Sequence, residues 1–591
     1  MCGIFGIIGK HDKTKAKKAY ETLSHRGPDS CAVVAKDNLF LGHYRLSIID
    51  PLPEANQPMQ VDNTTILMNG EIYNYRELKS RLEADFKTKS DTEVALRTFK
   101  KWGKKMPRHL RGMYAIAIIE NGLIHLFRDP FGKKPLYYAK MKDSFIFASE
   151  IKAILAMYPE IKWSKESITS YFSYQSTISP NTFFKEIHQL ELGGYLRYDG
   201  KDIFISVDEE DIFTYGNDKL DSNQLEKLLQ ESVRYRLVSD VTIGALLSGG
   251  IDSSLVAAMA CKISKDSLPT FTVGYEGFEK YDERKFAKIV ADHIGSDLHS
   301  FEMGLDDFLE CSEELISHMD EPFGDPAAIP LWFLTKKIKE QGIKVILSGD
   351  GADELFFGYR PYYEMIDIEK ARDLRYKNWL RSYFRGNYSP NREWEWYKRI
   401  FDDSILFRSS AELFTDLQQN RLLKQNVKDD TSLMWIDHYT KRSKKTTGPW
   451  WYSYIDIKVQ LGDVFLKKLD RVSMAHGIEA RSPFMDRVLV QKLFSCDPKW
   501  RIGKKPKWLL KEVAKRYLPI EIIKRKKKGF SYPFIEWLSA TGELERVIQI
   551  NAKLKLFDSE ALKFMIEKSK KGRFKHHLYA VWFLCRWIEK H

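Results

Sequence analysis

The chain has 591 residues, 43% of them hydrophobic and 30% charged, which is too long for one ordinary core and typical of about two to four soluble domains. The net charge of +13 permits a polyanionic partner, but the densest basic run, residues 524–528, lacks interleaved aromatic residues, so we expect no nucleic-acid binding. Six scattered cysteines without a CxxC pair argue against a zinc site or disulfide framework, and without an apolar run of about 18 residues or a secretory signal we expect a cytoplasmic protein with no membrane partner.

Cys2 stands where removal of the initiator methionine would make it the first residue. A terminal cysteine carries both a nucleophilic thiol and a free α-amine that works as a base near neutral pH, so one residue could supply nucleophile and base together. Any protein can carry a cysteine at position 2, so this interpretation depends on the rest of the chain.

The first 200 residues show the pattern of short β-strands with two helices. Strands are expected at residues 66–68, ending at Asn69–Gly70, and at residues 113–119 and 123–127. The last two flank Asn121–Gly122, a strong hairpin signal. Apolar residues at three- and four-residue spacing predict helices over residues 16–23 and 92–102. We therefore predict an α+β domain built as an αββα sandwich.

A polar, acidic segment at residues 199–223 interrupts the hydrophobic pattern, and we place the boundary there, between domains 2–200 and 215–591. Strands and helices then alternate, over residues 241–247, 253–263, 271–273 and 286–293. This alternation predicts an α/β domain with a doubly wound parallel sheet, in which ligands bind at the carboxyl ends of strands. Beyond Tyr362 strands become scarce, which indicates a helical C-terminal extension.

The segment Ser248–Ser254, with sequence SGGIDSS, lies directly between a predicted strand and a predicted helix. Its two glycines allow a sharp turn with outward N–H groups, and the helix N-terminus favours negative charge, so the segment predicts a phosphate cradle. No lysine follows the glycines, so simple γ-phosphoryl transfer is not indicated. The alternative is a tight turn capped by serine or aspartate.

A second predicted strand, residues 345–347, ends in the segment Ser348–Glu354. The two strand ends would bring four carboxylates near one triphosphate, and carboxylate oxygens are what Mg²⁺ accepts beside phosphates. These carboxylates are Asp252, Asp350, Asp353 and Glu354. ATP with Mg²⁺ is therefore the expected cofactor pair, although any one of these acids could merely cap a helix.

Several motifs occur in a shared order along nearly the whole length. They are Cys2–Ile4, His25–Asp29, Arg45–Asp50, Asn69–Asn74, Ser248–Ser254, Ser348–Glu354 and Asp470–Ala475. With these motifs the chain resembles the glutamine-hydrolysing asparagine synthetases. That family joins an N-terminal-nucleophile, class II glutamine amidotransferase domain to a PP-loop ATP-pyrophosphatase domain.

The resemblance implies a glutamine site with a cysteine nucleophile, an oxyanion hole, an arginine for the α-carboxylate and two acids for the α-amine. In that order these are Cys2, Asn69 with Gly70, Arg45, and Glu71 with Asp91, and Leu46, Ser47, Ile48 and Ile49 complete the set. Taken singly, each would be an ordinary turn or surface residue.

The resemblance also implies a second site that activates a carboxylate as an acyl-adenylate, which ammonia then converts to an amide. ATP binding falls to Leu247, Ser248, Gly249, Gly250, Asp252, Ser253, Val273, Ser348 and Gly349, metal binding to Asp252 and Asp353, and catalysis to Asp350 and Lys507. Lys507 comes from aligning residues 503–507 with a family GKxxK stretch. Ammonia would need an apolar tunnel, whose lining the sequence does not assign.

Two departures from the family bear on the acceptor. Asp350 stands where well-characterised members carry glutamate, and residues 320–330 lack a threonine pair and an arginine that suits the second carboxylate of aspartate. Aspartate remains the favoured substrate, and the alternative is another carboxylate, such as a sugar uronic acid of surface polysaccharide biosynthesis. A noncatalytic regulatory or nucleic-acid-binding relative is the weakest alternative, because Cys2 and both phosphate motifs are present. The resemblance allows a homodimer.

Overall fold

The structure is a computed structural model that describes residues 2–209, 211–264, 267–387, 389, 391–424, 430–503, 505–526, 529 and 531–591. Lys527 and Lys528 of the basic run, Lys504 of the GKxxK stretch and Glu210 of the acidic segment lie outside these residues. Among the described residues, every helix is too short or too polar to span a bilayer.

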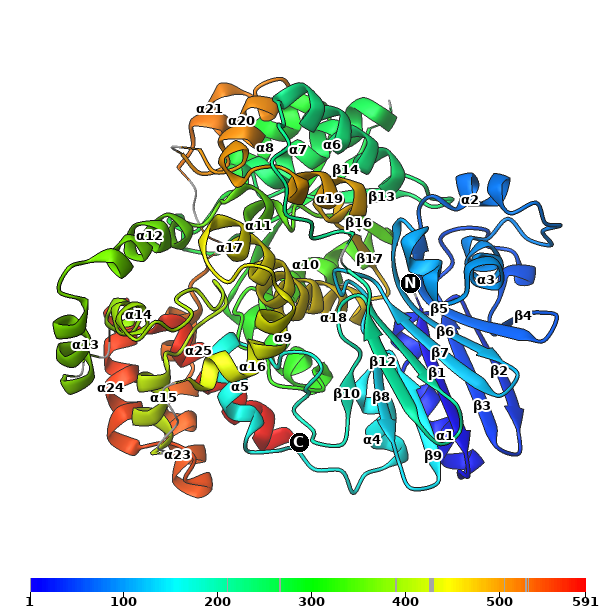
Figure 1. The fold of residues 1–591 in the computed structure, drawn as a ribbon, viewed down its shortest axis with the longest axis horizontal. Helices are drawn as coiled ribbons and strands as arrows, with labels where there is room; N and C mark the ends of the chain where they lie inside the picture. Colours follow the sequence, from blue (N-terminus) through cyan, green and yellow to red (C-terminus); the bar gives the residue numbers. More distant parts are fainter. Residues whose placement is uncertain are drawn as a thin grey trace.

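Two six-stranded antiparallel sheets form the N-terminal part (Figure 1). The first runs in the order β10 (His188–Gln189), β8 (Tyr137–Lys140), β9 (Ser144–Ala148), β1 (Gly3–Gly9), β3 (Leu39–Arg45) and β2 (Ser30–Lys36). The second runs in the order β12 (Ile203–Val207), β11 (Gly194–Tyr198), β7 (Leu123–Arg128), β6 (Gly112–Glu120), β5 (Thr64–Ile72) and β4 (Met59–Val61). A separate apolar cluster that includes Ile4, Leu67 and Phe147 joins strands of both sheets.

Helices cover the outer faces of the two sheets. Helices α1 (Lys13–Glu21) and α4 (Ile151–Met157) pack on the first sheet, and α3 (Asp91–Trp102) packs on the second beside α2 (Tyr75–Arg81). This arrangement confirms the predicted αββα sandwich. The hairpin is also confirmed, because Asn121 and Gly122 take φ values of 51° and 80° between β6 and β7, as a type I′ turn requires.

The predicted end of a strand at Asn69–Gly70 is wrong. Strand β5 continues to Ile72 and pairs with β6 over its whole length. A Cβ atom at Gly70 would lie 2.1 Å from the carbonyl oxygen of Met113, so glycine is needed here for close strand approach and not for a turn.

The third sheet is parallel throughout and confirms the predicted α/β domain. Its order is β15 (Asp297–Met303), β14 (Pro269–Tyr275), β13 (Ile243–Leu246), β16 (Val345–Leu347) and β17 (Glu479–Arg481). In Figure 1, α6 (Ser222–Arg236), α7 (Ile251–Ser264) and α8 (Arg284–Ile294) lie above this sheet, and α9 (Leu305–His318) and α10 (Ala328–Glu340) lie below. The strand order reverses between β13 and β16, and a ligand crevice is expected at such a point.

The rest of the chain is mainly helical, as predicted, except that β17 completes the parallel sheet. Its helices are α11 (Ala352–Phe356), α12 (Arg360–Glu369), α13 (Lys377–Gly386), α14 (Arg392–Phe401), α15 (Asp416–Leu423), α16 (Thr431–Arg442), α17 (Gly448–Asp456), α18 (Lys467–Ala475), α19 (Arg487–Ser495), α20 (Trp508–Ala514), α21 (Ile520–Lys524), α22 (Phe534–Ala540), α23 (Glu543–Leu554), α24 (Ser559–Lys570) and α25 (Lys575–Lys590). A buried π-helical segment, Ile457–Leu466, joins α17 to α18.

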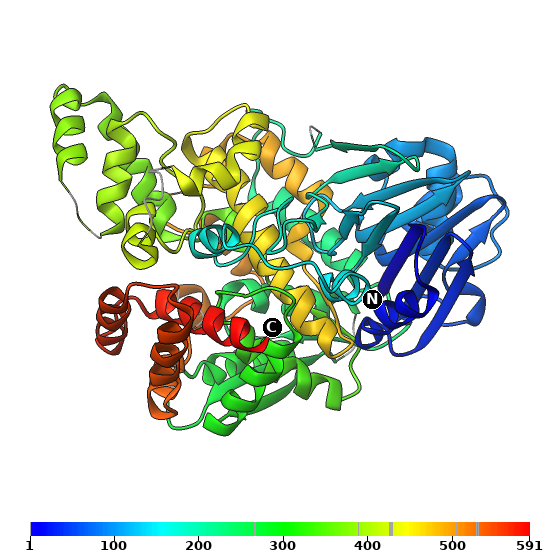
Figure 2. The same cartoon turned by 90° about the horizontal axis from the view of Figure 1, so that it is seen from below.

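Helix α5 (Ser167–Tyr174) belongs to the first 200 residues but packs among the C-terminal helices. The hydroxyl groups of Tyr171 and Tyr174 donate to the carbonyl oxygens of Ala580 (2.8 Å) and Ser432 (2.6 Å). In Figure 2 the cyan part of the chain extends from the sandwich toward the yellow helices. The division into residues 2–200 and 215–591 stays a prediction, and the two parts interlock.

Candidate active sites

Cys2 directly precedes β1, with 6% of its surface exposed. Its main-chain nitrogen donates to Oδ1 of Asn69 (3.1 Å), which lies on β5 of the other sheet. Its carbonyl oxygen accepts from Nε of Arg26 (3.1 Å). The sandwich therefore holds the main chain of Cys2 from both sides and leaves the thiol in a nearly closed site.

The side-chain amide of Asn69 is oriented by this contact. Because Oδ1 faces Cys2, Nδ2 is the group left over, and it is buried without a hydrogen-bond partner among the described residues. A buried, unpaired donor is costly unless a ligand completes it. An N–H donor beside a nucleophile is what an oxyanion hole requires.

Two buried carboxylates, Glu71 and Asp91, lie on or beside the strand that carries Asn69, because Glu71 is two residues further along β5. Asp91 begins α3, and its Oδ2 accepts from the N–H of Ile72 (2.8 Å). Burial, supported by the negative charge of Glu479, raises the pKa of Asp91 to about 6. Burial together with the charges of Glu479 and Asp91 raises the pKa of Glu71 well above its usual value. A cationic group placed here would relieve both carboxylates.

The resemblance assigns Arg45 to the α-carboxylate of glutamine, but in the structure its side chain contacts other groups of the protein. Its guanidinium donates to Asn56 Oδ1 (2.8 Å) and to the carbonyl oxygens of Leu52 (3.0 Å), Ile49 (3.2 Å) and Asp50 (2.6 Å). It therefore shapes the loop that follows β3. Within that loop Leu46, Ile48 and Ile49 are buried, and the N–H of Ser47 donates to Asp29 (2.7 Å). A contact between Arg45 and a substrate carboxylate stays a prediction.

A buried ionic cluster contacts the main chain of Cys2 through Arg26 and was not predicted from the sequence. Arg26 is fully buried and pairs with Glu150 (2.7 Å) and with Asp470 of α18 (2.9 Å). Asp470 also pairs with Lys134 (3.0 Å), and Glu150 pairs with Arg471 (2.9 Å). The motifs containing Arg26 and Asp470 supported the resemblance, but their spacing does not reveal that the two residues meet.

Strand β17 was also missed, and it reaches both candidate sites. Arg481 pairs with Glu479 (2.5 Å) and lies 3.8 Å from Glu71. The carbonyl oxygen of Arg481 accepts from the N–H of Ser348 (2.8 Å), and the hydroxyl groups of Ser482 and Ser348 are 3.0 Å apart. One short strand thus connects the glutamine-site acids to the second phosphate loop. The apolar ammonia tunnel stays a prediction.

The first phosphate loop forms a tight turn before α7, and its binding of an anion stays a prediction. Gly249 has a φ of 67°, and a Cβ atom there would lie 2.5 Å from Cβ of Phe286. The hydroxyl groups of Ser248 and Ser253 are 3.0 Å apart, and the N–H of Gly250 donates to Ser248 (3.3 Å). Only glycine fits at position 249, so a tight turn precedes the N-terminus of α7.

The second loop packs directly against the first. A Cβ atom at Gly349 would lie 2.7 Å from the main-chain nitrogen of Ser253. Leu247, directly after β13, is buried, and Val273 lies on the adjacent strand β14, so these two expected ATP-binding residues belong to neighbouring strands. The contact between the loops brings together the predicted ATP-binding segments.

Lys507 bridges the two predicted metal ligands. Its Nζ lies 2.5 Å from Asp252 and 2.6 Å from Asp353. Although burial opposes the charged form, these carboxylates raise the pKa of Lys507 above its usual value. A cation already sits between two hard carboxylates, so this donor set fits a divalent ion such as Mg²⁺ beside phosphate oxygens.

The other two acids of this motif lie differently. Asp350 stands in the turn between Gly349 and Gly351, whose φ is 99°. Glu354 is buried and accepts from the hydroxyl of Tyr359 (2.8 Å), and burial with the charge of Asp353 raises its pKa to about 8. Glu354 is therefore a packed acid with a raised pKa, and its expected place near a bound triphosphate stays a prediction.

The acidic stretch that departs from the family, residues 320–330, is held by cations. Glu321 pairs with Lys467 (2.8 Å) and Asp325 pairs with Lys468 (2.5 Å). Asp320 lies 3.2 Å from Arg471. Both Lys467 and Lys468 belong to α18, so the helix that reaches Cys2 through Asp470 also fixes this stretch.

Comparisons with known proteins agree with this two-site arrangement. A family model described as asparagine synthase matches residues 224–589, and one described as a glutamine amidotransferase domain matches residues 1–207. Asparagine synthetase [glutamine-hydrolyzing] 1 of Bacillus subtilis (strain 168) is 32% identical over 577 residues, which cover 91% of this chain and 88% of that protein. Amidase chry2 of Gibberella zeae is 28% identical and covers 91% of this chain and 90% of its own length. The match to a solved glutamine phosphoribosylpyrophosphate amidotransferase from B. subtilis covers 46% of this chain and 65% of that chain, at 20% identity and a TM-score of 0.28.

Proposed function

The chain belongs to the asparagine synthase family, and we propose that it transfers the amide nitrogen of glutamine to a carboxylate at the expense of ATP, with aspartate as the acceptor. The observation that carries this proposal is the contact of the Cys2 main-chain nitrogen with Asn69, which leaves a buried amide donor without a partner in the part of the chain that the structure describes. A cytoplasmic location and a homodimer stay predictions.

In the glutaminase half, the Cys2 thiolate attacks the side-chain amide of glutamine and forms a thioester, and the α-amine of a processed Cys2 moves the proton to the leaving ammonia. Nδ2 of Asn69 and the N–H of Gly70 would stabilise the oxyanion. Glu71 and Asp91 would hold the substrate α-ammonium, whose charge offsets their mutual repulsion. Water then releases glutamate.

In the synthetase half, a substrate carboxylate oxygen attacks the α-phosphorus of ATP, and pyrophosphate leaves into the loop of Ser248–Ser253. Ammonia then attacks the acyl carbon, and AMP leaves. Asp252 and Asp353 would hold Mg²⁺, which when bound neutralises phosphate charge. Lys507 would turn from these two carboxylates to the phosphates or the adenylate when ATP and the metal enter.

A second acceptor class is favoured by one observation. An aspartate substrate has a second carboxylate that needs a cation, but Lys468, one of the cations that contact the divergent stretch, already pairs with Asp325 (2.5 Å). A substrate without a second carboxylate, such as a sugar uronic acid, would not need to break this pair.

The deciding experiment supplies the purified chain with glutamine, ATP and Mg²⁺ and either aspartate or a uronic acid such as glucuronate. Asparagine, AMP and pyrophosphate formed in equal amounts with aspartate would support the favoured reaction. Glutamine hydrolysis and AMP release only with the uronic acid would select the alternative. If a folded chain releases neither AMP nor pyrophosphate with either acceptor, the result contradicts amidation of these substrates.

A further inference from the structure

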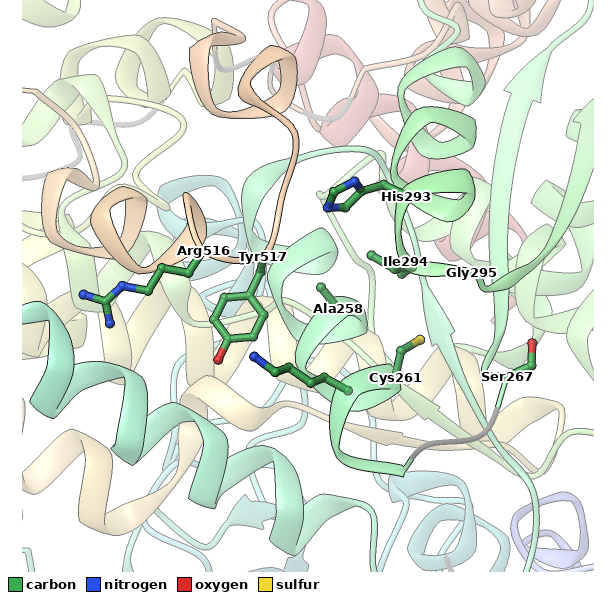
Figure 3. Close-up of a pocket in the computed structure, with 9 residues that line it drawn as sticks. Ala258, Cys261, Ser267, His293, Ile294, Gly295, Arg516 and Tyr517 are labelled. Carbon is green, nitrogen blue, oxygen red and sulfur yellow. The ribbon is translucent and has the colours of Figure 1, made fainter.

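Two adjoining hollows lie in the ATP-binding half, beside the last turn of α7, and Figure 3 shows the residues that line the first. Their volumes are about 380 and 310 Å³, within the range of small-molecule pockets. They share Lys262, near the end of α7, and Tyr517, just beyond α20. The first is also lined by Cys261, His293 and Arg516, and the second by Arg234.

The lining is basic. Lys262, Arg234, Arg516 and His293 contribute cationic or basic groups, and no carboxylate occurs among the described residues that line either hollow. Arg516 is engaged by Glu226, but Lys262 and Arg234 form no ion pair with any described residue. The Nζ atom of Lys262 lies 4.9 Å from the centre of the Tyr517 ring. Lys262 and the Tyr517 ring thus border both hollows, Arg234 borders the second, and Glu226 accepts from the Tyr517 hydroxyl (2.6 Å).

This space lies at the opposite end of the elements that form the candidate ATP site. Helix α7 begins beside Asp252 and α20 begins beside Lys507, and these two residues form an ion pair. Lys262 is ten residues beyond Asp252 on the same helix, about 15 Å along its axis. A molecule held between Lys262 and Tyr517 would therefore act on the spacing of the helices that carry Asp252 and Lys507.

We propose that this double pocket binds a nucleotide-sized phosphate ester and that its occupancy regulates the ATP-dependent half. The phosphate lies among Lys262, Arg234 and His293, and a planar base stacks on Tyr517. Regulation of the ATP-dependent half rests on the proposed function, whereas binding of a phosphate ester to the double pocket does not. Separate experiments can therefore refute either claim.

Binding is tested by calorimetry on the full chain with a nonhydrolysable ATP analogue saturating the catalytic site. UMP and GMP serve as probes. Uridine, which lacks the phosphate, and ribose 5-phosphate, which lacks the base, serve as comparison ligands. We expect saturable binding of a nucleotide and weaker binding of uridine and of ribose 5-phosphate. No saturable binding of UMP or GMP at millimolar concentration would overturn the proposal. Binding of ribose 5-phosphate as tight as that of the nucleotides would overturn the stacking on Tyr517.

Variants locate the site. Lys262→Met should weaken nucleotide binding about tenfold through loss of a charge-assisted contact, and Lys262→Arg should restore most of it. Arg234→Gln, at an exposed position, provides a second test if the first variant folds poorly. Lys288→Met, on the neighbouring helix α8 and 71% exposed, is the matched control and should leave binding unchanged. Unaltered binding in both site variants would place the ligand elsewhere.

Regulation is read as the affinity for the ATP analogue with and without the bound nucleotide. A shift of threefold or more that disappears in Lys262→Met supports coupling along α7 and α20. If the affinity for the ATP analogue does not change although the nucleotide binds, the result refutes the coupling but not the binding site.

Discussion

Gly358→Ala tests the candidate ATP site without removing any functional group. A Cβ atom at position 358 would lie 1.8 Å from Oδ1 of Asp353 and 2.3 Å from Cε of Lys507. Real Cβ atoms keep at least 3.0 Å, so the Asp353 oxygen must move by about 1.2 Å, the difference between these values. Displacement of a catalytic group by about 1 Å can cost about 100-fold in rate. Gly358 is not among the residues with positive φ, so alanine adds no backbone strain.

The assay is pyrophosphate release with ATP, Mg²⁺ and ammonium, measured with the acceptor that the substrate experiment identifies. We expect a loss of about 100-fold, while glutamine hydrolysis at Cys2 continues at its normal rate. Gly386→Ala is the control, because a Cβ atom there meets nothing within 4 Å. Undiminished pyrophosphate release by a folded Gly358→Ala protein would refute the role assigned to the pair of Lys507 and Asp353.

Four further outcomes follow from the described contacts. Cys2→Ala should abolish glutamate release but retain amide synthesis from ammonium, and loss of both activities in a folded variant would contradict separate sites. Asp252→Asn should do the reverse, so normal ammonium-dependent synthesis would remove the metal assignment. Arg26→Met should lower the free energy of unfolding by about 3 kcal/mol in thermal or denaturant unfolding, because it leaves buried carboxylates uncompensated. The same substitution should lower it less in a protein that already carries Asp470→Asn, because Arg26 and Asp470 are coupled. Glutamine binding to the Cys2→Ala protein should weaken as the pH falls below about 6, because protonation of Asp91 removes the negative charge that holds the α-ammonium, and Asp91→Asn should flatten this dependence.

Local patterns predicted the parts of the fold that local chemistry determines. The Asn121–Gly122 hairpin and the turn at Gly249 depend on backbone conformations that only a few residue types adopt, so both are readable from a few letters. The same reasoning failed at Asn69–Gly70, because there glycine serves the close approach of β6 and not a turn.

Features formed by distant segments were not readable. Strand β17 has three residues, too few for a periodicity, and its neighbour β16 lies more than 130 residues earlier in the chain. The meeting of Arg26 with Asp470 joins residues 444 positions apart. Only the tertiary structure shows that the second half of the chain supplies groups to the surroundings of Cys2.

The contact of Arg26 with Asp470 constrains how such an enzyme can be divided or recombined. A fragment ending near residue 207 would keep the nucleophile but lose Asp470, and Arg481 beside Glu71. A chimaera joining this glutaminase to a foreign synthetase must import α18 and β17 with it, or redesign the buried charges they neutralise. The smallest transplantable unit is therefore a junction that includes pieces of both halves, and not the sandwich alone.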